Sequence, residues 1–386
     1  MAISFQAILI RRERFKRAWS QEGLCKGICA VSYLSKIEQG KAVASREMME
    51  LFMKRLDMAW QSQEEAQEAQ KLAEQLYEAV FCMDTAREHS LMEQLAKKRE
   101  AYLNGPSMLD FLLFEQYEEL SADAMLCEFE NAFDERQRAL WLQLNERYEE
   151  LLRLYPSAWA YGCAGVMDYR KGCYSQAQER LVRGYELAAA EGYVHVMLHC
   201  KLFLGNCYSD LDEYDMMLKQ YQVAERLAEA IGDTQATRDL YYNRAVTAMQ
   251  LGKYKEAYAY FSRIAQPTAM HYHKLAICCE KLDKREEALA ALNCAQTAPT
   301  DFPDREWVVQ MCAVVSYRLL HPSYLGDECY GSMLLDCFKR MRKELPNGYA
   351  TYHLPWVLEW YTANRQYKQA YELSNEFSNK YHEKGL

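Results

Sequence analysis

The chain has no long run of apolar residues. Its longest runs cover only a few positions, far short of the roughly 20 residues that span a bilayer as a helix. It does not open with a charged start, an apolar stretch and a small-residue cleavage site, the three parts of an export signal. We therefore expect a cytoplasmic protein with no membrane partner. With 386 residues, half of them hydrophobic, the chain is long enough for two or three domains.

Motifs of common catalytic and metal sites are also missing. The fourteen cysteines include no Cys-x-x-Cys pair, and we expect them to be reduced and packed in the core. There is no G-x-G-x-x-G, no phosphate-binding loop and no G-x-S-x-G. His195 and His199 have the spacing of two metal ligands on one helical face, but the glutamate of H-E-x-x-H and a nearby third ligand are absent. The sequence therefore predicts no enzyme, no metal site and no cofactor.

Charge is distributed unevenly along the chain. Residues 1–60, which we call the head, hold eleven lysines and arginines against six acidic residues, a net charge of +5. Because the whole chain carries −9, residues 61–386, the body, carry −14. A basic head on an acidic body confines contact with a polyanion such as DNA to the head.

The head has the pattern of a helix-turn-helix. We predict its helices over residues 4–17, from Ser20 to near Gly27, from about Val31 to Glu38, and over residues 45–57. Serines are typical N-caps at the second and fourth starts, and Gly40 ends the third helix. Apolar side chains recur where a small core needs them: Phe5, Ile8, Leu9, Phe15, Leu24, Ile28, Leu34, Ile37, Met48, Met49, Leu51, Phe52 and Leu56. Such a unit places its second motif helix, here 31–38, in the major groove of DNA.

Side chains near the start of that helix are placed to contact base edges. Ser32, Tyr33 and Lys36 occupy outward positions there, and Gln21 on the preceding helix can reach a phosphate or a base edge. We predict these four as DNA-binding residues, without separating phosphate contacts from base contacts. The alternative is that they form the solvated face of an ordinary small helical domain. The core spacing, the turn length and the charge together favour DNA.

The head resembles the phage-repressor-type helix-turn-helix, also called the xenobiotic-response-element (XRE) type, over roughly residues 8–57. Ile10 and Arg14 match the first-helix signature of that family, and the resemblance implies that Arg14 pairs with Glu38. The turn is one residue shorter than the common phage-repressor form, with Ile28 and Cys29 before it. That shorter form resembles the RRNPP family of peptide-pheromone receptors of Gram-positive bacteria.

A short pattern recurs along the helical body. A turn residue is followed two positions later, in most copies, by tyrosine, and three positions after that by a small or flexible residue. The copies begin at Gly172, Asp212, Gly252, Asp283 and Arg365. This is the pattern of tetratricopeptide (TPR) repeats, helical hairpins of about 34 residues that stack into a superhelix with a concave groove.

Aligned on these marks, five repeats begin near residues 158, 198, 238, 269 and 351. The first two intervals are 40 residues, which predicts longer loops between helix pairs. We expect a weaker repeat over 125–157, an irregular unit over 303–350 and connecting and degenerate helices over 64–122. The fold class is therefore predicted to be all-α, with a helix-turn-helix domain at 1–60 and a right-handed TPR solenoid at 61–386.

One face of the first helix of each repeat lines the groove of a TPR solenoid. The residues on or beside that face that we predict to bind a ligand are Tyr169, His199, Asn206, Tyr242, Asn243, Met249 and His273. Asparagine suits this role because its amide both donates to and accepts from a peptide backbone. Asn243 also resembles an asparagine that the peptide receptors carry on this helix. The alternative is that such an asparagine only bridges neighbouring helices.

These features predict a transcription regulator that binds double-stranded operator DNA as a homodimer through its heads and a short oligopeptide through its body. Binding of the peptide would change the dimer arrangement and so the spacing of the heads. The RRNPP resemblance implies an imported peptide pheromone and quorum sensing. It leaves one alternative open, a protein-interaction module that sequesters or modulates a partner protein, as Rap-like members do.

Overall fold

We describe the fold from a computed structural model, which describes residues 4–59, 61–119, 124–300, 305–344 and 347–382. Every regular element in these ranges is an α-helix or a short 3-10 helix, so the predicted all-α class is confirmed. None of the helices in the described ranges combines the length and apolar character of a membrane span. The chain divides into two compact units, Met1–Cys207 and Tyr208–Leu386. This division does not test the predicted boundary between residues 60 and 61, which stays a prediction.

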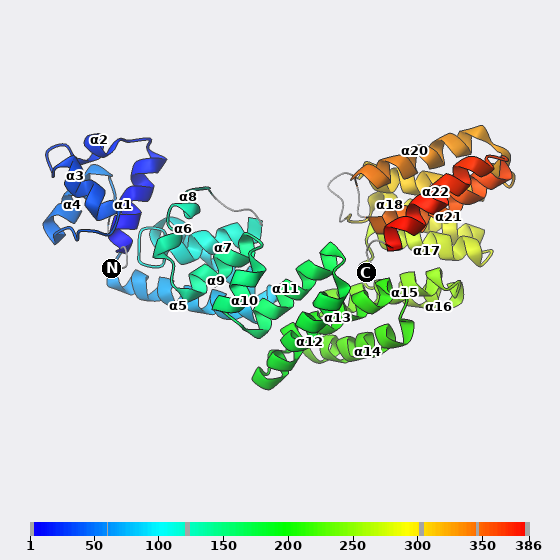
Figure 1. Cartoon of the computed structure of the whole chain (residues 1–386), viewed down its shortest axis with the longest axis horizontal. Coiled ribbons are helices and arrows are strands. Elements are labelled where there is room, and N and C mark those ends of the chain that lie inside the picture. The colour runs from blue at the N-terminus through cyan, green and yellow to red at the C-terminus, as the bar shows by residue number, and fades with distance from the viewer. Residues whose placement is uncertain (1–3, 60, 120–123, 301–304, 345–346, 383–386) are drawn as a thin grey trace. The chain divides into compact units, whose positions relative to one another are not determined.

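The described part of the head folds into helices that match the predicted ranges (Figure 1): α1 Phe5–Lys16, α2 Gln21–Cys25, α3 Val31–Glu38 and α4 Arg46–Arg55. Ser4, Ser20 and Ser45 cap three of them, because each hydroxyl accepts a hydrogen bond of 3.0–3.3 Å from a backbone N–H of the first turn. Ala30 precedes α3 and supplies no side-chain cap. The centre of the head's own core is formed by Ile10, Leu24, Leu34, Phe52 and Leu56, all fully buried.

Two apolar residues expected in that core lie at the surface instead. Phe15 is 43% exposed and Leu51 is 50% exposed, so their predicted burial is wrong. Phe15 packs against the guanidinium groups of Arg11 and Arg14, which lie 5.4 and 4.6 Å from the ring centroid. Cations over an aromatic face are attracted by its quadrupole, so the ring is partly covered without entering the core.

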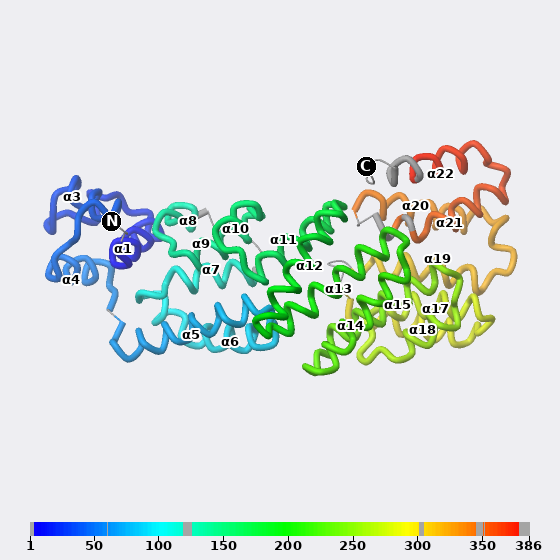
Figure 2. The backbone as a smooth tube through the Cα atoms, turned by 60° about the horizontal axis from the view of Figure 1, so that its bottom comes forward, coloured from blue at the N-terminus to red at the C-terminus, as the bar shows by residue number. Residues whose placement is uncertain are grey.

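A second core joins the head to the first helices of the body. Ile8 and Leu9 of α1 and Met53 of α4 are at most 3% exposed and belong to this core, together with Trp141 and Trp159. The body helices of unit 1 are α5 Gln63–Phe81, α6 Thr85–Tyr102, α7 Met108–Glu119, α8 Ala124–Cys127, α9 Glu135–Leu144, α10 Tyr148–Leu154, α11 Ala158–Lys171, α12 Tyr174–Glu191 and most of α13 Val194–Asp210, with a 3-10 turn at Glu130–Ala132. Within this unit α5 and α6 lie side by side, as do α11 and α12 (Figure 2).

Unit 2 is built from helical hairpins around one core. Its elements are α14 Tyr214–Ile231, α15 Thr234–Gln250, α16 Tyr254–Phe261, α17 Ala269–Lys281, α18 Arg285–Thr297, α19 Glu306–Leu320, a 3-10 turn at Tyr324–Gly326, α20 Glu328–Glu344, α21 Asn347–Ala363 and α22 Tyr367–His382. Buried side chains from Tyr241 to Phe377 form a single cluster. Helices α15 and α16, α17 and α18, and α21 and α22 pack as consecutive pairs.

The predicted turn residues of the repeats all adopt the left-handed backbone conformation. The φ angle is +77° at Gly172, +59° at Asp212, +70° at Gly252, +58° at Asp283 and +57° at Arg365. The small or flexible residues that follow are buried at Ala177, Met217, Ala257 and Ala288. The turn reverses the chain and the small side chain lets the second helix cross closely, so the prediction of hairpin repeats is confirmed.

Two further hairpins lie where the repeat pattern is weak or absent. Met83 and Glu146 have φ angles of +58° and +55°, and they connect α5 to α6 and α9 to α10. The positions two and five after Met83 hold Thr85 and Glu88 instead of a tyrosine and a small residue. The repeat pattern therefore did not reveal the α5–α6 hairpin, which lies in a segment expected to hold connecting and degenerate helices.

The wide spacing of the first repeats does not come from longer loops, and that prediction is wrong. α12 and α14 are each 18 residues long, and only two residues separate each of them from the next helix. The extra residues lengthen the helices. For this reason α13 and α15 begin at Val194 and Thr234, four residues before the predicted starts, whereas α11 and α17 begin where predicted.

Candidate functional site

The predicted DNA-binding residues of α3 present a mixed surface. Ser32 and Lys36 are exposed, as expected for side chains that face a groove. Tyr33 is half-buried, and its hydroxyl donates a hydrogen bond of 3.2 Å to the backbone carbonyl of Val43. Tyr33 therefore holds the segment after α3 in place, and its ring rather than its hydroxyl remains for contact with DNA.

Behind this surface, a buried ion pair sets the angle between α1 and α3. The guanidinium of Arg14 donates two hydrogen bonds to the carboxylate of Glu38, 2.7 Å from Nε and 2.8 Å from Nη2. The two residues are only 8% and 4% exposed, and Arg14 also donates to the carbonyl of Trp19 at 3.0 Å. The pair that the family resemblance implied is confirmed.

Gln21 serves this same ion pair. Its side-chain amide donates a hydrogen bond of 2.8 Å to the second carboxylate oxygen of Glu38. Gln21 thus links α2 to α3, and its side-chain NH2 group is engaged in a hydrogen bond within the protein. Its role in DNA contact stays a prediction.

The face of α1 opposite the head's core carries a polar junction to the body. Arg12 is 5% exposed and donates a hydrogen bond of 2.8 Å to the carbonyl of Leu103, and Arg11 forms an ion pair with Glu128. Glu13 is buried beside Arg12 and accepts hydrogen bonds from it and from Arg17. Burial opposes ionisation of Glu13, but the hydrogen bonds from Arg17 and Arg12 and the charges of Arg12 and Lys16 outweigh it and hold its pKa below the ordinary value.

Sequence reasoning counted these arginines only as part of the positive charge of the head. Part of that charge instead faces the body, since the guanidinium groups of Arg11 and Arg12 contact Glu128 and Leu103. The signal in the sequence was the consecutive apolar run at residues 7–10, which surrounds α1 rather than following one face and so predicts contacts on more than one side.

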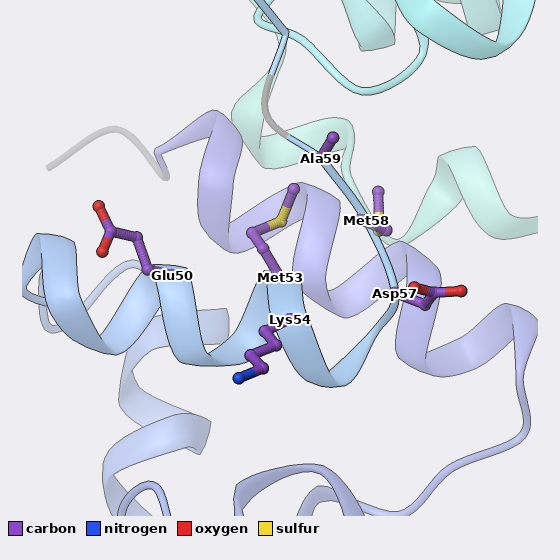
Figure 3. A pocket seen from close by; sticks show the side chains of 6 residues that line it. All are labelled: Glu50, Met53, Lys54, Asp57, Met58 and Ala59. Carbon is purple, nitrogen blue, oxygen red and sulfur yellow. The ribbon is translucent and has the colours of Figure 1, made fainter.

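An open pocket of about 490 Å³ lies at the end of α4 (Figure 3), lined by Glu50, Met53, Lys54, Asp57, Met58 and Ala59. Met53 and Met58 give it apolar walls, while the charged groups come from α4 and from the segment that follows it. None of the predicted site residues lines this pocket.

Three predicted ligand residues lie in unit 1. Tyr169 on α11 and His199 on α13 both contact the ring of Phe203, with centroid distances of 5.6 and 4.8 Å. Asn206 is half-buried on the same helix as His199. Burial, with a smaller effect of the charge on Arg170, lowers the pKa of His199 to about 4, so its imidazole is neutral at pH 7. The structure thus brings Tyr169 and His199 together around one aromatic ring.

The other four lie in unit 2, and two of them are partly accessible. Tyr242 is half-buried, and its ring meets those of His271 and Phe261 edge to face at 5.0 and 6.0 Å. Asn243 is half-buried, and its backbone carbonyl accepts a hydrogen bond from the hydroxyl of Thr247. The seven predicted ligand residues thus fall into two groups, three in unit 1 and four in unit 2.

Met249 and His273 are covered by α21. Met249 is 4% exposed, and the hydroxyl of Tyr352 lies 3.9 Å from its sulfur. His273 is fully buried and stacks on His353, with ring centroids 6.1 Å apart. Both side chains are thus buried in this structure, and their predicted contact with a ligand stays a prediction.

Unit 2 also contains a buried lysine that the sequence did not single out. Lys274 is 3% exposed, and its Nζ lies 3.0 Å from the ring centroid of Tyr352. Burial lowers the pKa of Lys274 well below its ordinary value. Nearby, Arg318 is buried, donates a hydrogen bond of 2.9 Å to Glu280 and lies over the ring of Trp356. A lysine in a helical sequence is expected to face solvent, which is why this position was missed.

Comparison with known proteins gives one curated relative and several solved structures. No protein-family model matches the chain. Transcriptional activator NprA of Geobacillus stearothermophilus is 23% identical over 275 residues, which cover 62% of this chain and 67% of NprA. A Rap protein in complex with competence and sporulation factor is 15% identical with a TM-score of 0.62, covering 83% of this chain and 99% of that one. The apo form of the quorum sensor NprR from B. thuringiensis is 14% identical with a TM-score of 0.58, covering 80% and 99%.

These similarities test the predicted fold of the body and the family resemblance of the chain. The two solved structures are so distant in sequence that they show the fold, and they confirm a TPR-like arrangement of helical hairpins. Together with the similarity to NprA, they confirm the resemblance to the RRNPP-type peptide-pheromone receptors that the sequence indicates.

Proposed function

We propose that this protein is a transcription regulator that binds operator DNA through α3 and is controlled by a short signalling peptide bound on its TPR-like helices. The observation that carries the proposal is the head. A small basic helix-turn-helix with net charge +5 holds α3 by the buried Arg14–Glu38 pair and leaves Ser32 and Lys36 exposed on it. The similarity to a transcriptional activator supports the same function.

The peptide part of the proposal rests on the body. Its helical hairpins resemble those of a quorum sensor and of a Rap protein that was solved in complex with competence and sporulation factor. The acidic body disfavours a second contact with DNA. The half-buried Asn206, Asn243 and Tyr242 offer amide and aromatic groups that suit a peptide backbone and its side chains. Dimerisation through the body, which would space two heads along DNA, belongs to this proposal.

Selection of DNA from a pool of random duplexes by the full chain tests the DNA-binding part. We expect a defined sequence, repeated in two half-sites if the protein is a homodimer. The peptide is sought separately, by mass spectrometry of small molecules that copurify with the protein from its own host. Recovery of random sequences only, at low and at moderate salt, would contradict the proposal.

The alternative is a protein-interaction module, and the match to a Rap protein favours it among other functions. In that case the body would modulate a partner protein and the head would be dispensable. Deleting residues 1–60 is a poor test, because Ile8, Leu9 and Met53 belong to a core shared with the body. Full-length Lys36→Glu is better: it should lose gene regulation if DNA is the target and keep it if a partner protein is.

A further inference from the structure

Two valines stand out at the surface around α3. Val31 is the first residue of α3 and is 43% exposed, and Val43, in the segment after α3, is 75% exposed. Phe15 is also exposed, but the guanidinium groups of Arg11 and Arg14 partly cover its ring. A single exposed apolar side chain needs no explanation, but here two flank the exposed polar residues of one helix.

The structure holds the second valine near α3. The hydroxyl of Tyr33 donates to the backbone carbonyl of Val43 at 3.2 Å, which links the segment after α3 to the helix itself. Val31 lies at the start of α3, the end that contacts base edges in a helix-turn-helix. Both valines are thus tied to the element that enters the groove if the proposed function is correct.

The exposed polar side chains of α3 can distinguish few base pairs by hydrogen bonding. Lys36 is the helix's one basic residue, and Ser32 is small and can bond to any base pair. In the major groove the C5 methyl of thymine is the apolar group that distinguishes a T·A pair, and apolar side chains read it by direct contact. The net charge of +5 on the head complements the phosphates of DNA, and DNA is the occupant that we assign to this surface.

We propose that Val31 and Val43 contact thymine methyl groups in the major groove and so determine part of the sequence preference. This rests on the proposed function, since it requires α3 to lie in that groove. A methyl group removed from water contributes enough that losing one contact weakens binding about fourfold.

Uracil replaces thymine without its methyl group and tests the proposal directly. A duplex selected by the full-length protein is synthesised with thymine and again with uracil, and both affinities are measured at one salt concentration. For the wild type we expect about fourfold weaker binding to the uracil duplex for each methyl contacted. Val31→Ala and Val43→Ala should bind the thymine duplex more weakly and should show a smaller ratio between the two duplexes.

Leu51→Ala is the matched control, because Leu51 is an apolar residue on α4 whose exposure of 50% lies between those of Val31 and Val43. Leu51→Ala should keep the wild-type ratio of affinities for the thymine and uracil duplexes. An effect of uracil on DNA shape would be the same in all variants, whereas loss of a direct contact changes the ratio only in the valine variants. Equal wild-type affinity for the two duplexes, in a protein whose DNA binding Lys36→Glu abolishes, would overturn this proposal and leave the proposed function standing. A full-length protein that selects no duplex at all would overturn both.

Discussion

Arg14 and Glu38 join α1 to α3 through two parallel hydrogen bonds inside the head, and Gln21 adds a third to the same carboxylate. Both members of the pair are buried, so each charge depends on the other for compensation. The orientation of the helix that we propose to read DNA therefore depends on a pair that does not itself reach the surface.

Glu38→Ala should destabilise the protein strongly, because it leaves the guanidinium of Arg14 buried without its carboxylate. We expect a loss of about 3–5 kcal/mol in the free energy of unfolding, the usual range for breaking a buried pair. Thermal and chemical unfolding of the full chain measure it. Glu50→Ala, which removes the partner of the exposed Arg46, is the control and should cost less than about 1 kcal/mol. Equal stability of the two variants would refute the structural role of the pair.

Arg12 links the head to the body by its hydrogen bond to the carbonyl of Leu103. Arg12→Met keeps the aliphatic stem and leaves Glu13 paired with Arg17. Because the hydrogen bonds of a buried charged group to Leu103 and to Glu13 are lost, we expect stability to fall by at least about 1.5–3 kcal/mol and proteolysis between residues 56 and 63 to be faster. Arg46→Met, at a fully exposed arginine, should change neither measurement. A cleavage rate like that of the wild type would show that Arg12 does not hold the head to the body.

Lys274→Met should stabilise unit 2. Methionine fills a similar volume beside Tyr352 and removes an amine that is buried in the folded state. We expect a gain of about 1–4 kcal/mol at pH 7, by comparison with the range seen when buried ion pairs are replaced by apolar side chains. Lys281→Met, at the exposed end of the same helix, is the control. A loss of stability in Lys274→Met would mean that the contact of the amine with Tyr352 outweighs the cost of burying it.

The same variant gives a prediction for pH. Burial lowers the pKa of Lys274 in the folded chain, so the folded state favours the neutral amine. The cost of the lysine is absent above its unfolded pKa of about 10.4, grows as the pH falls below that value, and becomes constant below the folded pKa. The stability difference between Lys274→Met and the wild type should therefore be small near pH 10 and grow as the pH falls toward neutral.

The repeat architecture could be predicted from the sequence because its marks are local. A turn residue that adopts positive φ, with a small residue five positions later, locates a hairpin without knowledge of the rest of the fold, and all five such turns have that conformation. The lengths of α12 and α14 were not predicted, because a spacing between marks does not say whether extra residues extend a helix or a loop.

The candidate site was predicted less completely, because burial depends on elements distant in sequence. Exposure of Ser32 and Lys36 follows from the pattern of one helix. The cover of Met249 and His273 comes from α21, about 80 residues further along the chain than the nearer of the two, and no local pattern reveals it. The burial of Lys274 has the same origin, since it packs on Tyr352 of that helix.

Asn243→Ala tests the peptide part of the account. Loss of one neutral hydrogen bond should weaken binding of the peptide that copurifies with the protein several-fold, or about 0.5–1.5 kcal/mol, as measured by calorimetry. DNA affinity without peptide should be unchanged. Gln250→Ala, an exposed amide on the same helix, is the control and should bind peptide as the wild type does. Equal peptide affinity in Asn243→Ala and the wild type would place the ligand elsewhere.

The central claim is that α3 of the head binds DNA, and charge reversal on that helix tests it most directly. Fluorescence anisotropy with the selected duplex, at one fixed salt concentration, compares the wild type with Lys36→Glu and with Lys71→Glu, which changes the charge equally at an exposed site on α5. The account predicts a loss of at least tenfold in affinity for Lys36→Glu, with an unchanged melting temperature, and little change for Lys71→Glu. Equal affinities of Lys36→Glu and the wild type would contradict it.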